Sequence, residues 1–157
     1  MSDELASAVV KQLIARKKTL ALAESCTGGL IANKITNVPG TSDIFLGGVV
    51  SYVNSAKEKF LGVSVETLEK FGAVSVETAR EMAIGAREKF GSDFVIAVTG
   101  IAGPTGGSAE KPVGTVFVAL ASAEKIEVKK FFNPGERIFF KETTATQALE
   151  WLRQISA

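Results

Sequence analysis

Residues 19–36, TLALAESCTGGLIANKIT, decide the fold. The first five, 19–23, form a short apolar run that predicts a buried strand, and the stretch 28–36 predicts a helix. Between them lie Ser25 and Thr27 in a small polar turn that ends in two glycines. A strand that passes through a short turn into a helix is the basic unit of α/β domains.

The same alternation continues on both sides of this stretch. Apolar spacing predicts helices over 4–17, 54–61, 75–90 and 135–155, and strands over 44–53, 94–99, 113–121 and 125–132, of which the last two form a hairpin. Two copies of VSVET, at 63–67 and 74–78, each place a serine (Ser64 and Ser75) as a helix N-cap. The order predicts a three-layer α/β/α sandwich with a mixed sheet, one domain over residues 1–157.

Composition narrows the class of protein. The 157 residues are 46 % hydrophobic and 22 % charged, which is typical of one globular domain with its own core. The net charge of +1 gives no support to a nucleic-acid partner. No apolar run approaches the roughly 18 residues that cross a membrane, and the acidic start is unlike a signal peptide. With a single cysteine, Cys26, these features predict a cytoplasmic protein without membrane contact.

The absence of histidine restricts the catalytic mechanisms and metal sites that this chain can form. Serine or cysteine catalysis with a histidine base is impossible within this chain, and a zinc site of nitrogen and sulfur ligands is disfavoured. Acid–base work must fall to lysine, tyrosine, aspartate or glutamate.

Ser25 is the first candidate for a reactive group. A serine between a strand and a helix lies near free backbone N–H groups that can bind an oxyanion, and Gly28 and Gly29 let a ligand approach the backbone. The alternative is that Ser25 or Thr27 only caps the helix. Cys26 competes as nucleophile, but without a histidine it is better explained as a buried structural thiol.

Lys57 is the candidate base. It follows Tyr52, the only tyrosine, in the segment SYVNSAK (51–57) at a strand-to-helix junction. A lysine whose pKa is lowered by burial can activate a serine, and a tyrosine can relay or donate a proton. The alternative is a surface lysine and a half-buried tyrosine.

A glycine-rich loop and an arginine are candidates for ligand binding. The segment VTGIAGPTGG (98–107) leaves a predicted buried strand, where α/β sheets bind ligands, and its N–H groups can hold a phosphate. Arg137 can grip a phosphate or carboxylate through its planar fork. The alternatives are a long flexible turn and a solvated arginine at a helix start.

Together these segments resemble the CinA C-terminal domain family, whose stand-alone members include nicotinamide mononucleotide deamidases. The resemblance rests on AESCTGG (23–29), SYxNxxK (51–57), VTGIAGPxGG (98–107), KPVG (111–114) and GER (135–137), and covers nearly the whole chain. It implies hydrolysis of nicotinamide mononucleotide to nicotinate mononucleotide and ammonia, without metal or cofactor, by a homodimer or larger homo-oligomer. The activity of the N-terminal half of full-length CinA is not expected.

The resemblance also implies the roles of individual residues. Ser25 would be the nucleophile, with Tyr52 and Lys57 completing the catalytic group. Substrate-binding residues are expected at Thr27, Gly28, Gly29, Asn54, Thr99, Gly100, Ala102, Gly103, Thr105, Gly106 and Arg137. Backbone N–H groups after Ser25 would bind the oxyanion.

Two positions depart from the family pattern. Glu136 stands where the family usually has aspartate, and Lys141 where it commonly has arginine. Lysine cannot make a bidentate fork, so phosphate affinity would differ if Lys141 contacts the substrate. Two other functions remain compatible with the sequence: a catalytically silent nucleotide-binding or regulatory module, and a structural partner domain in a competence or DNA-damage response.

Overall fold

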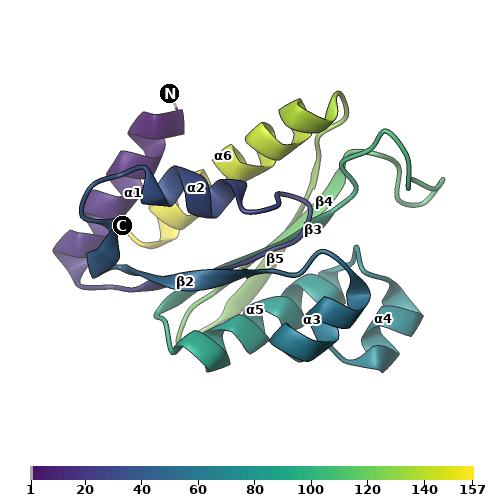
Figure 1. Cartoon of the computed structure of the whole chain (residues 1–157), viewed down its shortest axis with the longest axis horizontal. Helices are drawn as coiled ribbons and strands as arrows, with labels where there is room; N and C mark the ends of the chain where they lie inside the picture. Colours follow the sequence, from purple (N-terminus) through teal and green to yellow (C-terminus); the bar gives the residue numbers. More distant parts are fainter. Residues whose placement is uncertain (1) are drawn as a thin grey trace.

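A five-stranded mixed sheet forms the centre of the structure, a computed structural model that describes residues 2–157 (Figure 1). The strands lie in the order β2-β1-β3-β4-β5. Their bounds are Leu20–Glu24 (β1), Phe45–Val50 (β2), Phe94–Gly100 (β3), Thr115–Ala121 (β4) and Ile126–Phe132 (β5). The strand β1 pairs in parallel with β2 and β3, whereas β3, β4 and β5 pair antiparallel.

Helices cover both faces of this sheet, as Figure 1 shows. The helices α1 (Ser2–Arg16), α2 (Leu30–Thr36) and α6 (Arg137–Ile155) lie on one face. The helices α3 (Asn54–Leu61), α4 (Val65–Phe71) and α5 (Val76–Phe90) lie on the other. The predicted three-layer sandwich with a mixed sheet in a single domain is confirmed.

The central strands are buried on both faces, which explains why residues 19–23 lack a polar alternation. In β1, Leu20 and Leu22 join the core beneath α1 and α6, whereas Ala21 and Ala23 join the core beneath α5. The small alanines thus face α5, and the larger leucines face α1 and α6.

Several boundaries differ from those predicted. The helix α2 begins at Leu30 and not at 28, because Gly28 and Gly29 adopt φ angles of 60° and 97° that a helix cannot contain. The strand β2 ends at Val50 and not at 53, because the backbone carbonyls of residues 51 and 52 turn away to a lysine. The helix α6 begins two residues later than predicted, at Arg137, after Gly135 at φ 134°.

The predicted helix caps are confirmed. The side chains of Ser64 and Ser75 accept hydrogen bonds from the N–H groups of Thr67 and Thr78 and cap α4 and α5. The glycine-containing strand β2 carries an irregularity in its pairing with β1 between residues 20 and 21.

One edge of the sheet gathers the segments that the sequence marks as candidate sites. The parallel strands β1, β2 and β3 all end there, and β4 begins and β5 ends at the same edge. Ligands of open α/β sheets bind at the carboxyl ends of the strands, so this edge is the place for a site. Within residues 2–157 no helix is both long and apolar enough to cross a membrane.

Candidate active site

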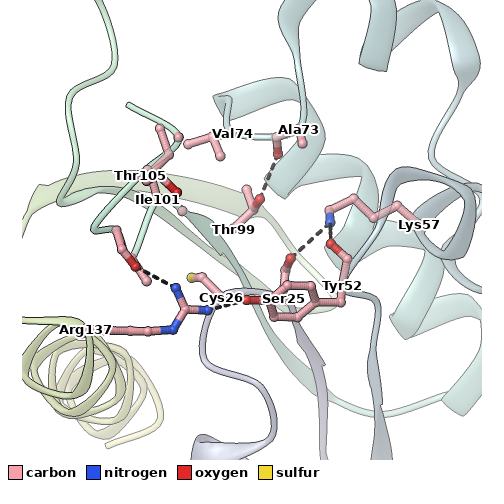
Figure 2. Close-up of a pocket in the computed structure, with 14 residues that line it drawn as sticks. Ser25, Cys26, Tyr52, Lys57, Ala73, Val74, Thr99, Ile101, Thr105 and Arg137 are labelled. Carbon is pink, nitrogen blue, oxygen red and sulfur yellow. Dashed lines mark hydrogen bonds between the residues drawn. The ribbon is translucent and has the colours of Figure 1, made fainter. Parts of the chain in front are cut away.

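Ser25 and Lys57 meet at this edge, although 32 positions separate them in the chain. Ser25 directly follows β1, and Lys57 is the fourth residue of α3. The Lys57 Nζ lies 3.0 Å from the Ser25 Oγ. Figure 2 marks this hydrogen bond with a dashed line. Both residues are shielded from water, with 7 % of Ser25 and 1 % of Lys57 exposed.

The surroundings of Lys57 make its neutral amine more accessible than that of an exposed lysine. Burial lowers the pKa of its ammonium below the ordinary value of 10.5. It forms no ion pair with any acidic residue of the described chain. Instead, its Nζ donates to the backbone carbonyls of Ser51, at 2.9 Å, and Tyr52, at 3.2 Å.

Counting hydrogens identifies the role open to this amine. A carbonyl can only accept, so the Ser51 and Tyr52 carbonyls take two Lys57 hydrogens. A neutral amine has no third hydrogen, and its lone pair then faces the Ser25 hydroxyl. Because a base must lie within hydrogen-bond reach of the proton it removes, the pair has the geometry of a nucleophile and its base.

Cys26 lies beside this pair but is chemically quiet. Burial, the largest effect, raises the pKa of its thiol to about 12, although the backbone N–H groups of Cys26 and Thr27 oppose the shift. A thiol with such a pKa carries almost no thiolate at neutral pH, so it is a poor nucleophile. This agrees with the buried structural thiol that the sequence predicts.

Tyr52 contacts Lys57 through its backbone and not through its phenol. The residue is 55 % exposed, and its hydroxyl accepts a hydrogen bond from Arg137. The guanidinium of Arg137 also donates to the Gly103 carbonyl, at 2.6 Å (Figure 2). Arg137, the first residue of α6, therefore links the β2–α3 loop to the glycine-rich loop.

A cavity of about 250 Å³ opens over the Ser25–Lys57 pair. The glycine-rich loop forms one wall. Thr99 also lines the cavity, and its hydroxyl donates to the Ala73 carbonyl at 2.7 Å. Ten predicted residues line the cavity: Ser25, Tyr52, Lys57, Thr99, Gly100, Ala102, Gly103, Thr105, Gly106 and Arg137.

The sequence did not identify three further lining residues, Ala73, Val74 and Ile101, as site residues. Ala73 and Val74 come from the α4–α5 connection, which approaches the cavity only in the folded chain. Their small apolar side chains carry no chemical signal. The VTGIAGPTGG segment contains Ile101, and its place in that loop was the only available signal.

Four residues predicted to bind substrate lie outside the cavity lining: Thr27, Gly28, Gly29 and Asn54. Thr27 is fully buried and its hydroxyl donates to Glu24, so the hydroxyl has no hydrogen to offer a ligand. Asn54 is exposed at the first turn of α3. Gly28 and Gly29 form the turn behind Ser25, and a Cβ on Gly28 would lie 3.6 Å from the Lys141 Nζ.

The N-terminus of α2 is not available to an oxyanion. The N–H groups of Ile31 and Ala32, in its first turn, both donate to the Glu24 carboxylate at 3.0 Å. The expectation that the helix N-terminus supplies the oxyanion donors is therefore wrong. The N–H groups of Cys26 and Thr27 remain, since neither has an oxygen acceptor within residues 2–157.

No group of three or more acidic or cysteine side chains in the described chain is arranged to hold a metal ion. What the site contains is a serine, a buried amine, an arginine and a loop rich in backbone donors. Fold and site thus define a three-layer α/β domain with a serine–lysine pair where its parallel strands end.

Comparison with known proteins gives the family. The model of the CinA C-terminal domain matches residues 2–156, so the chain belongs to the CinA C-terminal domain family. A putative competence-damage inducible protein of Thermoanaerobacter sp. (strain X514) is 52 % identical over 152 residues, which are 97 % of this chain and 37 % of that protein. A CinA-like protein of Geotalea daltonii is 59 % identical over 136 residues, 87 % of this chain and 33 % of that protein.

The chain thus spans about a third of the length of these curated relatives. Among solved structures, the competence/damage inducible protein CihA from Agrobacterium tumefaciens superposes with a TM-score of 0.96 at 41 % identity, covering 99 % of this chain and 96 % of that one. A CinA superfamily protein from Klebsiella pneumoniae gives 0.96 at 34 % identity, covering 99 % and 98 %.

Proposed function

We propose that the chain is an amidohydrolase that converts nicotinamide mononucleotide and water to nicotinate mononucleotide and ammonia. The observation that carries the proposal is the 3.0 Å contact between the Ser25 hydroxyl and the buried Lys57 amine. A serine needs a neighbouring base to attack an amide, and in a chain without histidine this amine supplies it. The substrate follows from the resemblance to nicotinamide mononucleotide deamidases.

In the first half of the reaction, the Ser25 Oγ attacks the carboxamide carbon while the neutral Lys57 takes the hydroxyl proton. The resulting oxyanion accepts hydrogen bonds from backbone N–H groups at Cys26 and Thr27. Lys57 then returns the proton to the amide nitrogen, the carbon–nitrogen bond breaks and ammonia leaves an acyl ester on Ser25.

In the second half, a water molecule gives a proton to Lys57 and attacks the ester carbon. The bond to the Ser25 Oγ breaks, that oxygen regains the proton from Lys57, and nicotinate mononucleotide is released. The carbonyls of Ser51 and Tyr52 hold the amine in place throughout, since both bind it in either protonation state.

The phosphate of the nucleotide is assigned to Arg137 and the glycine-rich loop. Arg137 has five donors, of which two are engaged by Tyr52 and Gly103, so others are free for an anion. The Tyr52 phenol is assigned to the substrate's sugar or phosphate side and not to proton relay, because it bonds Arg137. The resemblance further supports assembly as a homodimer or larger homo-oligomer.

Product analysis tests the proposal. Purified protein is incubated with nicotinamide mononucleotide, with nicotinamide riboside, which lacks the phosphate, and with nicotinamide. We expect nicotinate mononucleotide and an equal amount of ammonia from the first, and far slower turnover of the other two. Binding of the nucleotide without product would instead support the silent binding module.

A further inference from the structure

Glu24 is a buried carboxylate one residue before the proposed nucleophile, and neither the sequence motifs nor the mechanism above gives it a role. Only 1 % of it is exposed, and it forms no ion pair within the described residues. Burying an unpaired carboxylate is costly unless hydrogen bonds replace its water. We propose that Glu24 is a positioning residue that fixes the turn carrying Ser25; this inference rests on the proposed function.

The contacts of Glu24 enclose that turn. Its Oε1 accepts from the Thr27 hydroxyl at 2.6 Å and from the Ile31 N–H at 3.0 Å, and its Oε2 accepts from the Ala32 N–H at 3.0 Å. All three partners are donors, which matches the acceptor-only chemistry of a carboxylate. One side chain thus joins the end of β1 to the turn and to the first turn of α2.

The backbone at Glu24 fixes the other side of the site. Its carbonyl accepts from the Ser51 N–H at 2.9 Å, and the next N–H, that of Ser25, donates to the Val98 carbonyl at 3.1 Å. Ser51 in turn holds Lys57 through its own carbonyl. Glu24 therefore adjoins Ser25 in the chain and is connected to Lys57 by hydrogen bonds through Ser51.

The manner in which α2 is capped supports a specific role. The helices α4 and α5 are capped by a serine at the N-cap position, which is the usual solution. The N-cap of α2 is Gly29, which has no side chain, and the capping oxygens come from Glu24 five residues earlier. This arrangement keeps the Cys26 and Thr27 N–H groups free of the capping role.

A second carboxylate provides a matched control. Glu81 accepts from the Ser64 N–H at 2.9 Å and from the Thr67 hydroxyl, so it also binds a backbone N–H and a threonine at a helix start. It braces α4 and does not line the cavity. Glu81→Gln therefore makes the same chemical change without touching the Ser25 turn.

The experiment compares Glu24→Gln with Glu81→Gln. Glutamine has the same length as glutamate, but its NH₂ group would face one of the donors that now bind Glu24, so the turn that carries Ser25 must shift. A misplacement of about 1 Å costs on the order of 100-fold in rate, so we expect Glu24→Gln to lower kcat for ammonia release by about 10- to 100-fold with a smaller change in KM. Glu81→Gln keeps the wild-type kcat.

A milder pair of variants covers the case in which Glu24→Gln does not fold. Thr27→Val removes one donor to Glu24 and is expected to lower kcat, whereas Thr27→Ser keeps the hydroxyl and restores it. A merely structural role would lower the melting temperature in both Thr27→Val and Glu81→Gln without separating their kcat values.

A second readout is independent of the substrate. A fluorophosphonate phosphonylates an activated serine, and its rate of labelling at Ser25 is followed by intact mass. Slower labelling in Glu24→Gln than in Glu81→Gln supports the inference, whether or not nicotinamide mononucleotide is hydrolysed. A failure to hydrolyse nicotinamide mononucleotide would reject only the proposed substrate. Wild-type kcat and labelling rates in Glu24→Gln, or equal losses in Glu81→Gln, would overturn it.

Discussion

Lys57 is a buried amine with two carbonyl acceptors and one hydroxyl neighbour, and its protonation controls the proposed chemistry. Burial lowers its pKa below 10.5, so the active neutral form exists over a wider pH range than for an exposed lysine. Protonation removes the lone pair that faces Ser25. We predict that kcat/KM falls as pH falls through the Lys57 pKa, with the midpoint below 10.5.

The matched variant is Lys57→Arg, which stays charged and cannot act as a base. We expect a loss of about 10²- to 10⁴-fold in kcat, typical for removal of a general base, and no acidic limb in the residual activity. If Lys57→Arg showed the same decrease in kcat/KM at low pH, that decrease would come from the titration of another group.

At the residue scale, elimination and position led only part of the way to the pair. Without histidine the base had to be a lysine, tyrosine, aspartate or glutamate, and the family resemblance assigned Lys57 as the partner of Ser25. The sequence could not indicate that the Glu24 carboxylate accepts hydrogen bonds from the N-terminus of α2, because this depends on the side-chain conformation of Glu24 in the folded chain. The pairing of the Tyr52 hydroxyl with Arg137, 85 positions away, was equally beyond a local pattern.

The helix α3, which carries Lys57, rests on α5 through a glycine. A Cβ on Gly85 would lie 1.7 Å from the Leu61 carbonyl oxygen at the end of α3, a distance that forces the helices apart. We predict that Gly85→Ala lowers the free energy of unfolding by about 1–3 kcal/mol, as overpacking does, and lowers kcat by moving Lys57 from Ser25. Glu88→Ala, at an exposed position of α5, is the control for urea unfolding and turnover.

Lys111 follows the glycine-rich loop in the connection from β3 to β4 and ties this connection to α4. Its Nζ donates to the carbonyl of Phe71, the last residue of α4, at 2.7 Å. We predict that Lys111→Met raises KM several-fold by loosening this wall of the cavity and leaves the melting temperature nearly unchanged, since the contact is exposed. Lys125→Met, in the β4–β5 turn, removes a lysine far from the site; a KM change of the same size there would contradict the assignment.

Elements were predicted better than their ends. The type and order of the longer helices and strands follow from apolar spacing, because one face of each must be buried. The ends are decided by contacts between segments, such as the carbonyls of residues 51 and 52 that leave β2 to bind Lys57. The short helix η1 (Thr41–Asp43) was missed because three residues show no periodicity.

On the scale of the whole molecule, large apolar side chains are exposed on and next to β2, the outermost strand of the sheet. They include Leu46, Val50 and Val53. Exposed apolar edge strands are sites of association, which agrees with the homo-oligomer that the family resemblance implies. We predict that sedimentation velocity gives at least twice the chain mass of 16.5 kDa. Val50→Lys on this edge should shift the protein toward monomer, and a monomeric wild type would contradict the prediction.

The overall architecture was predictable because alternation of strands and helices leaves few ways to bury both faces of a sheet. The strand order β2-β1-β3-β4-β5 could not be predicted in the same way, since apolar strands carry little information about their neighbours. That order nevertheless creates the site, because it brings the ends of β1, β2 and β3 together.

Ammonia release from nicotinamide mononucleotide by wild type, Ser25→Ala and Ser92→Ala, with binding measured in parallel, tests the central claim most directly. Ser92 is another buried serine, and its hydroxyl has no partner within the described chain. It lies just before β3, at the end of the sheet opposite to Ser25. We predict release by wild type and Ser92→Ala, and none by Ser25→Ala, which still binds the nucleotide. Release by Ser25→Ala at the wild-type rate would contradict the assignment of Ser25 as nucleophile.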